Sequence, residues 1–180
     1  MRDADGQDPV QHLVVMGVSG SGKTTLAHLL TERLGWPYAE ADDFHPQANI
    51  DAMSAGTPLT DAQRWPWLST IRDHLTEQTR AGRSSVVTCS ALRRSYRDLL
   101  REAEGQVFFV HLTAPADLLG DRLALRAGHF MPAALLGSQL AALEPLTPDE
   151  PGATIVVDIP PEQVAEVAVT ALGLRPAAGG

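Results

Sequence analysis

Short apolar runs alternate along the chain with longer segments in which apolar residues recur every three or four positions. The runs are typical of buried strands: residues 12–16, 38–40, 84–89, 107–112 and 153–157. The longer segments have helical spacing: residues 23–34, 46–53, 66–79, 91–103, 116–126, 133–143 and 163–172. The pattern therefore predicts strands and helices that follow one another in turn.

Five repeats of strand and then helix predict an α/β fold, with a parallel sheet covered by helices on both faces. One domain is expected over residues 11–174, between flexible polar tails at 1–10 and 175–180. Residues 116–145 place two helical segments between adjacent strands. This stretch is therefore predicted to be an insertion, such as a lid.

Composition limits the class of protein. With 44% hydrophobic and 20% charged residues, the 180-residue chain can bury a core. A net charge of −8 argues against a general nucleic-acid or anionic-membrane binder. The longest apolar runs are too short to span a bilayer, the N-terminus is acidic and polar, and the single cysteine, Cys89, excludes an intramolecular disulfide. A soluble, cytoplasmic protein without a nucleic-acid or membrane partner is expected.

The strongest motif is GVSGSGKT at residues 17–24, which matches the phosphate-binding pattern G-x-x-x-x-G-K-[ST] between a predicted strand and a predicted helix. Its lysine, Lys23, is the one lysine of the chain, beside thirteen arginines. The loop N–H groups and Lys23 would hold the phosphates of ATP, and Thr24 would hold Mg²⁺. The predicted nucleotide-binding residues are Gly17, Ser19, Gly20, Ser21, Gly22, Lys23, Thr24 and Thr25.

Several nucleotide-binding classes do not fit the rest of the chain. A GTPase reads guanine with an N-K-x-D type motif, but the one lysine already belongs to the loop. A four-cysteine zinc lid cannot be built with one cysteine, and the chain is short for a motor or helicase ATPase. A small kinase is the simplest interpretation.

An acidic segment follows the second predicted strand. Ligands in open parallel sheets bind beyond the carboxyl ends of strands, and a kinase needs a carboxylate to orient or deprotonate the attacking hydroxyl. Asp42 is the candidate base, and Glu40 or Asp43 is the candidate for the metal's outer shell. His45 is a candidate donor to a substrate hydroxyl. The alternative is an acidic loop that caps the helix at Pro46.

Two groups of arginines have helical spacing. Arg93, Arg97 and Arg101 follow the third predicted strand at intervals of four and share one helix face. Arg122 and Arg126 lie four residues apart in the predicted lid, where they could stabilise charge during phosphoryl transfer. Solvated charged faces with surface salt bridges are the alternative for both groups.

These segments together resemble the gluconate kinases of the P-loop shikimate-kinase-like group over roughly residues 11–172. Beyond the loop, the resemblance rests on ADDFHPQANIDAM at 41–53, RWPWL at 64–68, CSALRRSYRDLLR at 89–101, RAGHF at 126–130 and VVDI at 156–159. It implies a three-layer fold with a five-stranded parallel sheet in the order 2-3-1-4-5 and a mobile helical lid.

The resemblance also implies an activity, namely transfer of the ATP γ-phosphoryl group to the 6-hydroxyl of D-gluconate, and it makes a homodimer an expected form. Carried over by position, the site residues fall into three groups. The catalytic group is Lys23, Asp42 and Arg126. The acceptor group is Asp42, His45, Arg64, Arg93 and Arg97. Arg122 and Asp158 join the nucleotide group, and Thr24 and Glu40 form the metal group. Two alternatives stay open, a kinase of the same fold acting on shikimate or another sugar acid, and a nucleotide-binding module without acceptor chemistry.

Overall fold

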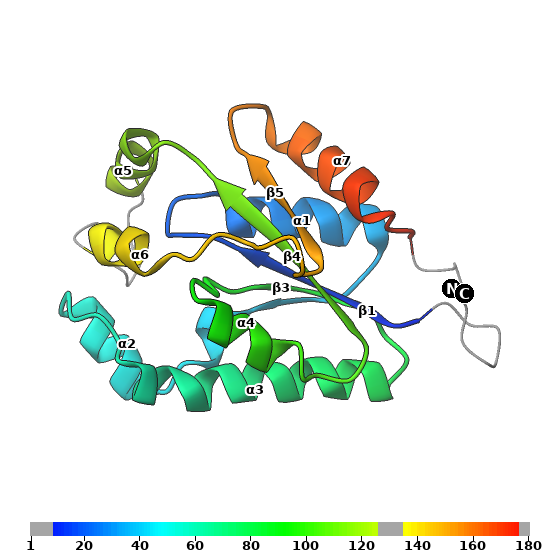
Figure 1. Cartoon of the computed structure of the whole chain (residues 1–180), viewed down its shortest axis with the longest axis horizontal. Helices are drawn as coiled ribbons and strands as arrows, with labels where there is room; N and C mark the ends of the chain where they lie inside the picture. The colour runs from blue at the N-terminus through cyan, green and yellow to red at the C-terminus, as the bar shows by residue number, and fades with distance from the viewer. Residues whose placement is uncertain (1–8, 126–134, 177–180) are drawn as a thin grey trace.

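Five parallel strands form one sheet in the order β2-β3-β1-β4-β5 in the computed structural model, which describes residues 9–125 and 135–176 (Figure 1). The strands are β1 (Gln11–Met16), β2 (Tyr38–Glu40), β3 (Ser85–Thr88), β4 (Gln106–Thr113) and β5 (Gly152–Val156). All four strand pairs are parallel. The predicted α/β class and strand order are confirmed.

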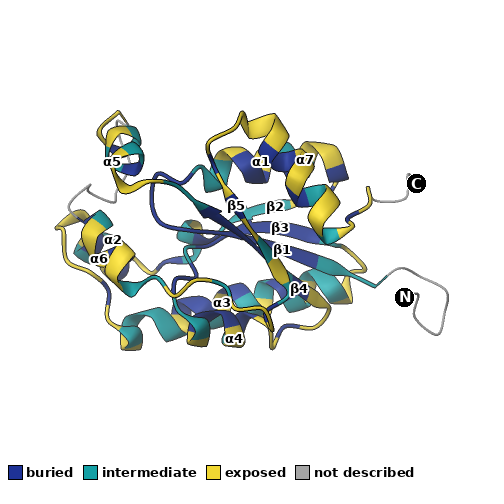
Figure 2. Ribbon diagram, turned by 45° about the horizontal axis from the view of Figure 1, so that its top comes forward, coloured by how far each residue is buried: buried dark blue, intermediate teal, exposed yellow. Residues whose placement is uncertain are grey.

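Helices cover both faces of this sheet. They are α1 (Lys23–Leu34), α2 (Gln47–Ser54), α3 (Asp61–Arg80), α4 (Arg94–Leu100), α5 (Ala116–Ala124), α6 (Leu136–Ala142) and α7 (Pro161–Leu172), with a 3₁₀ helix, η1 (Ala41–Phe44). Apolar residues of α1 and α7 pack in one cluster with the sheet, and those of α3 and α4 pack in another. Figure 2 shows the buried sides of both helix pairs turned toward the strands.

The central strand explains why the apolar run at residues 12–16 has no polar face. Leu13 and Val15 pack toward α1 and α7, whereas Val14 and Met16 pack toward α3 and α4. Successive side chains of a strand point to opposite faces, so a central strand between two helical layers must be apolar at every position. All four side chains are fully buried.

Helix α3 begins earlier than its spacing predicts. The expected start was Pro66, but the helix begins at Asp61 after a capping box, in which Thr60 accepts a hydrogen bond from the Gln63 backbone and the Gln63 side chain accepts one from the Thr60 backbone. Pro66 therefore lies inside the helix. This extension places Arg64 on α3.

The predicted insertion corresponds to α5 and α6, which lie between β4 and β5 in the chain, beyond the carboxyl end of β4 (Figure 1). Leu119 of α5 packs with Val18 and Leu92, and Leu136 and Leu143 pack against the same cluster. Both helices therefore contact the loop between β1 and α1. Within the described ranges, no helix combines the length and apolar character needed to cross a membrane.

Candidate active site

The loop between β1 and α1 has the backbone shape that its glycines predict. Gly17, Gly20 and Gly22 all have positive φ, at 144°, 82° and 94°. A Cβ on Gly17 would lie 2.7 Å from the Leu112 carbonyl oxygen, so no larger residue fits there. The loop therefore turns tightly against β4 and leads directly into α1.

Helix α1 starts without a side-chain cap. Its N-cap, Gly22, is left-handed and makes no side-chain hydrogen bond, and its first turn has no acidic residue. The first N–H groups of a helix need acceptors and carry a partial positive charge, which suits a phosphate. Lys23 folds back over the loop, where Nζ donates to the Val18 carbonyl oxygen at 3.1 Å.

Two cavities lie on either side of this loop. The first, here the Arg122 cavity, has a volume of about 390 Å³, within the usual size of small-molecule sites. Its polar part comes from the loop and Arg122, and its apolar part from α1, β4 and the β5–α7 connection. The lining residues are Gly20, Ser21, Gly22, Thr25, Leu26, Leu112, Arg122, Leu125, Val157, Ile159, Pro161 and Val164.

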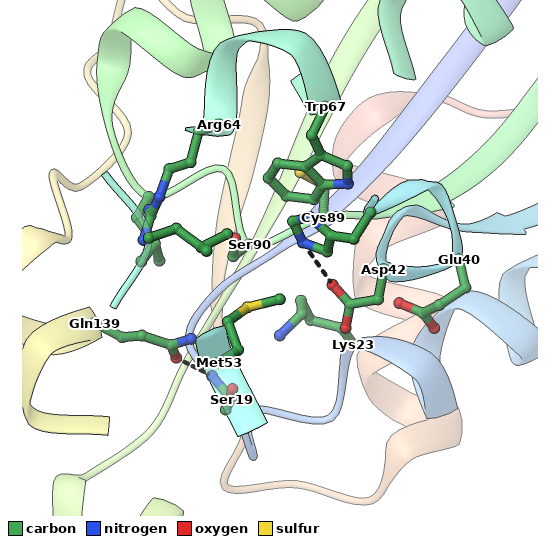
Figure 3. Close-up of a pocket in the computed structure, with 13 residues that line it drawn as sticks. Ser19, Lys23, Glu40, Asp42, Met53, Arg64, Trp67, Cys89, Ser90 and Gln139 are labelled. Carbon is green, nitrogen blue, oxygen red and sulfur yellow. Dashed lines mark hydrogen bonds and ion pairs between the residues drawn. The ribbon is translucent and has the colours of Figure 1, made fainter. Parts of the chain in front are cut away.

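The second, here the Lys23 cavity, collects the chemically active side chains (Figure 3). Lys23, Asp42 and Arg64 point into the same space, and Gln139 reaches toward Ser19 from the opposite wall. The lining residues are Ser19, Lys23, Glu40, Asp42, His45, Met53, Leu59, Arg64, Trp67, Cys89, Ser90, Leu92 and Gln139. The predicted lysine and carboxylate thus share one cavity.

Glu40 forms an oxygen-rich cluster at the end of β2. Its carboxylate accepts hydrogen bonds from Thr24 Oγ1 at 3.0 Å, from the Tyr38 hydroxyl at 2.5 Å and from Thr88 Oγ1. The two residues predicted for the metal, Thr24 and Glu40, are therefore in direct contact. Asp43, the alternative to Glu40, is exposed and does not line either cavity.

Asp42 and His45 lie on and directly after η1. The His45 Nε2 atom is 3.8 Å from Asp42 Oδ1, and the imidazole stacks on the indole of Trp67 with ring centres 4.0 Å apart. Burial, with a smaller contribution from the positive charge of Arg64, lowers the pKa of His45 to about 4. His45 is therefore a neutral imidazole at physiological pH.

Arg64 and Arg93, both predicted for the acceptor site, differ in position. Arg64 lines the Lys23 cavity, and its buried Nε has no hydrogen-bond partner among the described residues. Arg93 does not line the cavity but is the N-cap of α4 and pairs with Asp61 at 3.1 Å. The guanidinium groups of both stand over the ring of Tyr96.

The structure does not place Arg97 in the cavity where the predicted acceptor residues Asp42, His45 and Arg64 lie. Its side chain is fully buried and pairs with Glu150, which is also buried, at 2.5 Å and 3.0 Å. The same guanidinium donates to four backbone carbonyls, those of Ala91, Leu92, Glu144 and Pro145. Arg97 therefore holds the loop before α4 against the segment before β5, and it does not line the Lys23 cavity.

Some of the residues predicted to bind the nucleotide line the Arg122 cavity, and others do not. Arg122 lines the Arg122 cavity beside the loop, as do Gly20, Ser21, Gly22 and Thr25, whereas Ser19 lines the Lys23 cavity. Asp158 is exposed and does not line the Arg122 cavity, although its neighbours Val157 and Ile159 do. Arg126 lies outside the described residues.

Sequence reasoning missed Gln139. Its carboxamide oxygen accepts a hydrogen bond of 2.7 Å from the Ser19 backbone N–H, and its side chain is almost fully buried. The loop and α6 are 120 residues apart in the chain, so no local pattern joins them. Met53, Trp67 and Ser90 also line the cavity and were not predicted to do so.

Comparison with known proteins identifies the family. A family model described as an AAA domain matches residues 13–146. The gluconokinase of Gluconobacter oxydans (strain 621H) is 53% identical over 154 residues, which cover 86% of each chain. The chain belongs to the gluconokinase family. The thermosensitive gluconokinase of Escherichia coli (strain K12) is 41% identical over 78% of this chain and 75% of its own.

Solved structures agree with this membership. An unliganded sugar kinase from Janibacter sp. HTCC2649 is 52% identical, with a TM-score of 0.90 over 93% of this chain and 97% of that chain. A gluconokinase from Sinorhizobium meliloti 1021 is 41% identical, with a TM-score of 0.78 over 91% of each chain. The P-loop and the five-stranded sheet described above are thus those of a gluconokinase-family kinase, a fold that binds a nucleotide.

Proposed function

We propose that this protein transfers the γ-phosphoryl group of ATP to the 6-hydroxyl of D-gluconate and releases 6-phospho-D-gluconate and ADP. The observation that carries the proposal is that Lys23 and Asp42 line one cavity at the phosphate-binding loop. Lysine attracts the transferred phosphoryl group, and the carboxylate handles the acceptor hydroxyl. Membership of the gluconokinase family supports gluconate as the acceptor.

The Arg122 cavity suits the nucleoside end of ATP. Its apolar wall, with Leu26, Val157 and Ile159, would contact the base, while the loop N–H groups and Arg122 stand toward the phosphates. Loop residues line both this cavity and the Lys23 cavity, so the terminal phosphate could follow the loop from the first to the acceptor in the second. The chain would therefore bind the phosphoryl donor and the acceptor on opposite sides of one loop.

The contacts of Glu40 fit a magnesium ion. Mg²⁺ prefers oxygen ligands, keeps several waters and is commonly held by one or two protein oxygens together with substrate phosphates. The Thr24 hydroxyl and the Glu40 carboxylate supply such oxygens, 3.0 Å apart beside the loop. When bound, the ion would neutralise charge on the phosphate oxygens. Thr88 and Tyr38 would keep the Glu40 carboxylate oriented.

The transfer itself requires positioning and one proton acceptor. The gluconate 6-hydroxyl oxygen would form a bond to the γ-phosphorus as the bond from that phosphorus to the β,γ-bridging oxygen breaks. The hydroxyl proton would go to the Asp42 carboxylate, and ADP would leave. Lys23 and the loop N–H groups would stabilise the charge on the phosphoryl oxygens.

The acceptor end of the cavity offers positive charge for a sugar acid. Arg64 lines it, with a buried Nε that has no hydrogen-bond partner among the described residues. A guanidinium fork matches a carboxylate, so Arg64 is our candidate for the gluconate carboxylate. Arg93 lies near it over the same tyrosine ring and stays a prediction as a second contact.

The Lys23 cavity must widen before gluconate can bind. Its volume is about 40 Å³, which is room for a few water molecules and too little for a six-carbon acid. Gln139 on α6 and Met53 on α2 form part of its walls. Movement of these helices away from the loop would admit the acceptor, and their return would exclude water from the transfer. Helix α6, in the described part of the predicted lid, is thus a mobile wall in this proposal. Cytoplasmic location and a homodimer stay predictions.

A steady-state assay tests the proposed function. Purified protein is given Mg-ATP with D-gluconate, shikimate or other sugar acids in turn, and ADP release is measured. Among these acceptors, we expect only gluconate to give fast ADP release from Mg-ATP. In Lys23→Ala, we expect no ADP release with gluconate. Faster turnover of shikimate or another sugar acid would show that this compound, and not gluconate, is the acceptor. ATP binding without any acceptor-dependent ADP release would indicate a nucleotide-binding module without acceptor chemistry.

A further inference from the structure

Asn49, in the first turn of α2, is buried and touches His45. Its Nδ2 atom lies 3.1 Å from the Gln63 carbonyl oxygen and 3.3 Å from His45 Nδ1. Only 4% of the residue is exposed, although asparagine is usually found at the surface. A buried amide with two directed contacts indicates a specific role.

The two contacts of the Asn49 amide show whether Asn49 or His45 is the donor in the hydrogen bond between them. A backbone carbonyl only accepts, so the amide atom next to the Gln63 carbonyl oxygen must be the NH₂ nitrogen. That nitrogen has a second hydrogen, which is available to His45 Nδ1. His45 Nδ1 is then an acceptor, and the hydrogen of the neutral imidazole must be on Nε2.

We propose that Asn49 is a positioning residue that holds His45 as the Nε2–H tautomer, so that His45 donates a hydrogen bond to the acceptor hydroxyl from which Asp42 takes the proton. The proposal rests on the proposed function. His45 Nε2 and Asp42 Oδ1 are 3.8 Å apart, too far for a direct hydrogen bond. One hydroxyl oxygen can lie about 2.8 Å from both atoms, a normal hydrogen-bond length.

This arrangement gives the two groups complementary tasks. A hydroxyl oxygen accepts with its lone pairs and donates with its hydrogen. His45 would occupy a lone pair, which leaves the O–H bond directed at Asp42 and another lone pair directed at the phosphoryl group. The Nδ1–H tautomer would instead present a bare nitrogen at Nε2, which would compete with Asp42 for the same hydrogen.

The surroundings keep the imidazole neutral and in place. Trp67 stacks on one face of the ring, and the charged groups around it are Asp42 on η1, Arg64 on α3 and Lys23 at the start of α1. Burial is the main reason that the pKa of His45 is low, and Arg64 adds to it. A neutral ring has two tautomers, so a nearby donor such as Asn49 is needed to select one.

Nitrogen NMR of the imidazole tests the tautomer directly. In protein with ¹⁵N-labelled histidine at neutral pH, we expect the His45 signals of a protonated Nε2 and an unprotonated Nδ1. In Asn49→Asp, a carboxylate replaces the donor, so the hydrogen is expected to move to Nδ1. Wild-type signals from a protonated Nδ1 would overturn the proposal, whether or not the protein acts on gluconate.

Kinetics tests the consequence. We expect Asn49→Asp to raise the KM for gluconate or lower kcat, with at least a tenfold loss in kcat/KM for gluconate, while the KM for ATP stays within twofold. The matched control is Asp51→Asn on the same helix, whose carboxylate makes an exposed contact with Gln47 and should leave both constants unchanged. A similar loss in both variants would indicate a general effect on α2.

A double substitution separates positioning from a structural role. In His45→Gln the amide nitrogen can stand near the former Nε2 position and donate without any tautomer to select. Asn49→Asp should then cost less than threefold in the His45→Gln background. An equal loss in both backgrounds would show that Asn49 does not act through His45 and would overturn the proposal.

Discussion

The carboxamide oxygen of Gln139 accepts a 2.7 Å hydrogen bond from the backbone N–H of Ser19, which ties α6 to the phosphate-binding loop. Ser19 lines the Lys23 cavity, whereas Gly20, Ser21 and Gly22 line the Arg122 cavity. The contact therefore lies at the Lys23 cavity, which we propose for the acceptor, and not at the Arg122 cavity, which we propose for the nucleotide. Acceptor binding and the position of α6 should depend on each other.

Gln139→Met tests this link. Methionine has a similar length but cannot accept the Ser19 hydrogen bond well, so the closed position of α6 loses about 1 kcal/mol. The contact is already made before gluconate binds, so its loss should mainly make the cavity open more readily. We expect the association rate constant for gluconate to rise by up to about fivefold, since about 1 kcal/mol corresponds to a factor of about five. The KM for ATP should change little.

Ser138→Ala is the control for that substitution, because Ser138 lies on the same helix, is exposed, and donates from its hydroxyl to the nearby Leu135 carbonyl oxygen. For each variant, stopped flow gives the association rate constant for gluconate, and the steady-state assay gives the KM for ATP. An unchanged association rate constant for gluconate in Gln139→Met, or an equal change in Ser138→Ala, would contradict the link between α6 and acceptor binding.

Asp42→Asn tests the proton acceptor. The amide can still hydrogen-bond to a hydroxyl but cannot take its proton, so kcat should fall by roughly 10²–10⁴. Gluconate affinity, measured by calorimetry, should be largely kept. Asp43→Asn is the control, because Asp43 is exposed and lines neither cavity. An unchanged kcat in Asp42→Asn would remove Asp42 as the base.

Arg97→Met tests the corrected role of Arg97. Loss of the guanidinium removes the main partner of the buried Glu150 carboxylate, which keeps Thr147 and the more distant Arg94 at 3.9 Å, so we expect the free energy of unfolding to fall by about 3 kcal/mol. Arg101→Met is the control, because Arg101 is partly exposed and pairs with Asp98 at 3.6 Å, and it should change stability by less than about 1 kcal/mol.

Urea unfolding measures both arginine variants. Replacing both partners, in Arg97→Met with Glu150→Leu, should restore part of the lost stability, because no unpaired charge remains. A loss no greater than that of Arg101→Met would show that the buried pair contributes little.

The sequence predicted the fold well because its main signals are local. The strands are continuous apolar runs, and the loop glycines occupy backbone shapes that side chains cannot adopt. Helical spacing predicts Pro66 as the first residue of α3, whereas the Thr60–Gln63 capping box starts the helix at Asp61. A proline can lie within a helix when the signals around it are stronger.

The site was predicted less completely because its walls come from distant segments. Arg93 and Arg97 look alike as members of one helical stripe, yet Arg97 is buried by Glu150, which lies 53 residues further along the chain. The contact of Gln139 with the loop spans 120 residues. Helical spacing shows which side chains share a face, but it does not show what covers that face.

Buried histidines should make the fold sensitive to mild acid. His12, His45 and His111 are each at most 8% exposed, and burial lowers the pKa of each to about 4 from 6.5. Smaller contributions differ: the charge of Arg64 also lowers the pKa of His45, while that of Arg97 lowers and that of Glu150 raises the pKa of His111. The folded pKa is below the unfolded one, so between pH 6.5 and 4 the unfolded state binds more protons.

The free energy of unfolding should therefore decrease as the pH falls from 6.5 to 4, by up to about 1.4 kcal/mol per pH unit for each histidine. Asp149 should affect stability only at a lower pH than the histidines, because hydrogen bonds from Thr147 and Arg94 lower its pKa to about 2. His111→Leu removes one titrating group whose ring nitrogens have no hydrogen-bond partner in the described structure. In urea unfolding at pH 7 and pH 5, this variant should lose less stability on acidification than the wild type, and His28→Gln, at an exposed position, is the control. Equal losses in all three proteins would show that buried histidines do not set the acid sensitivity.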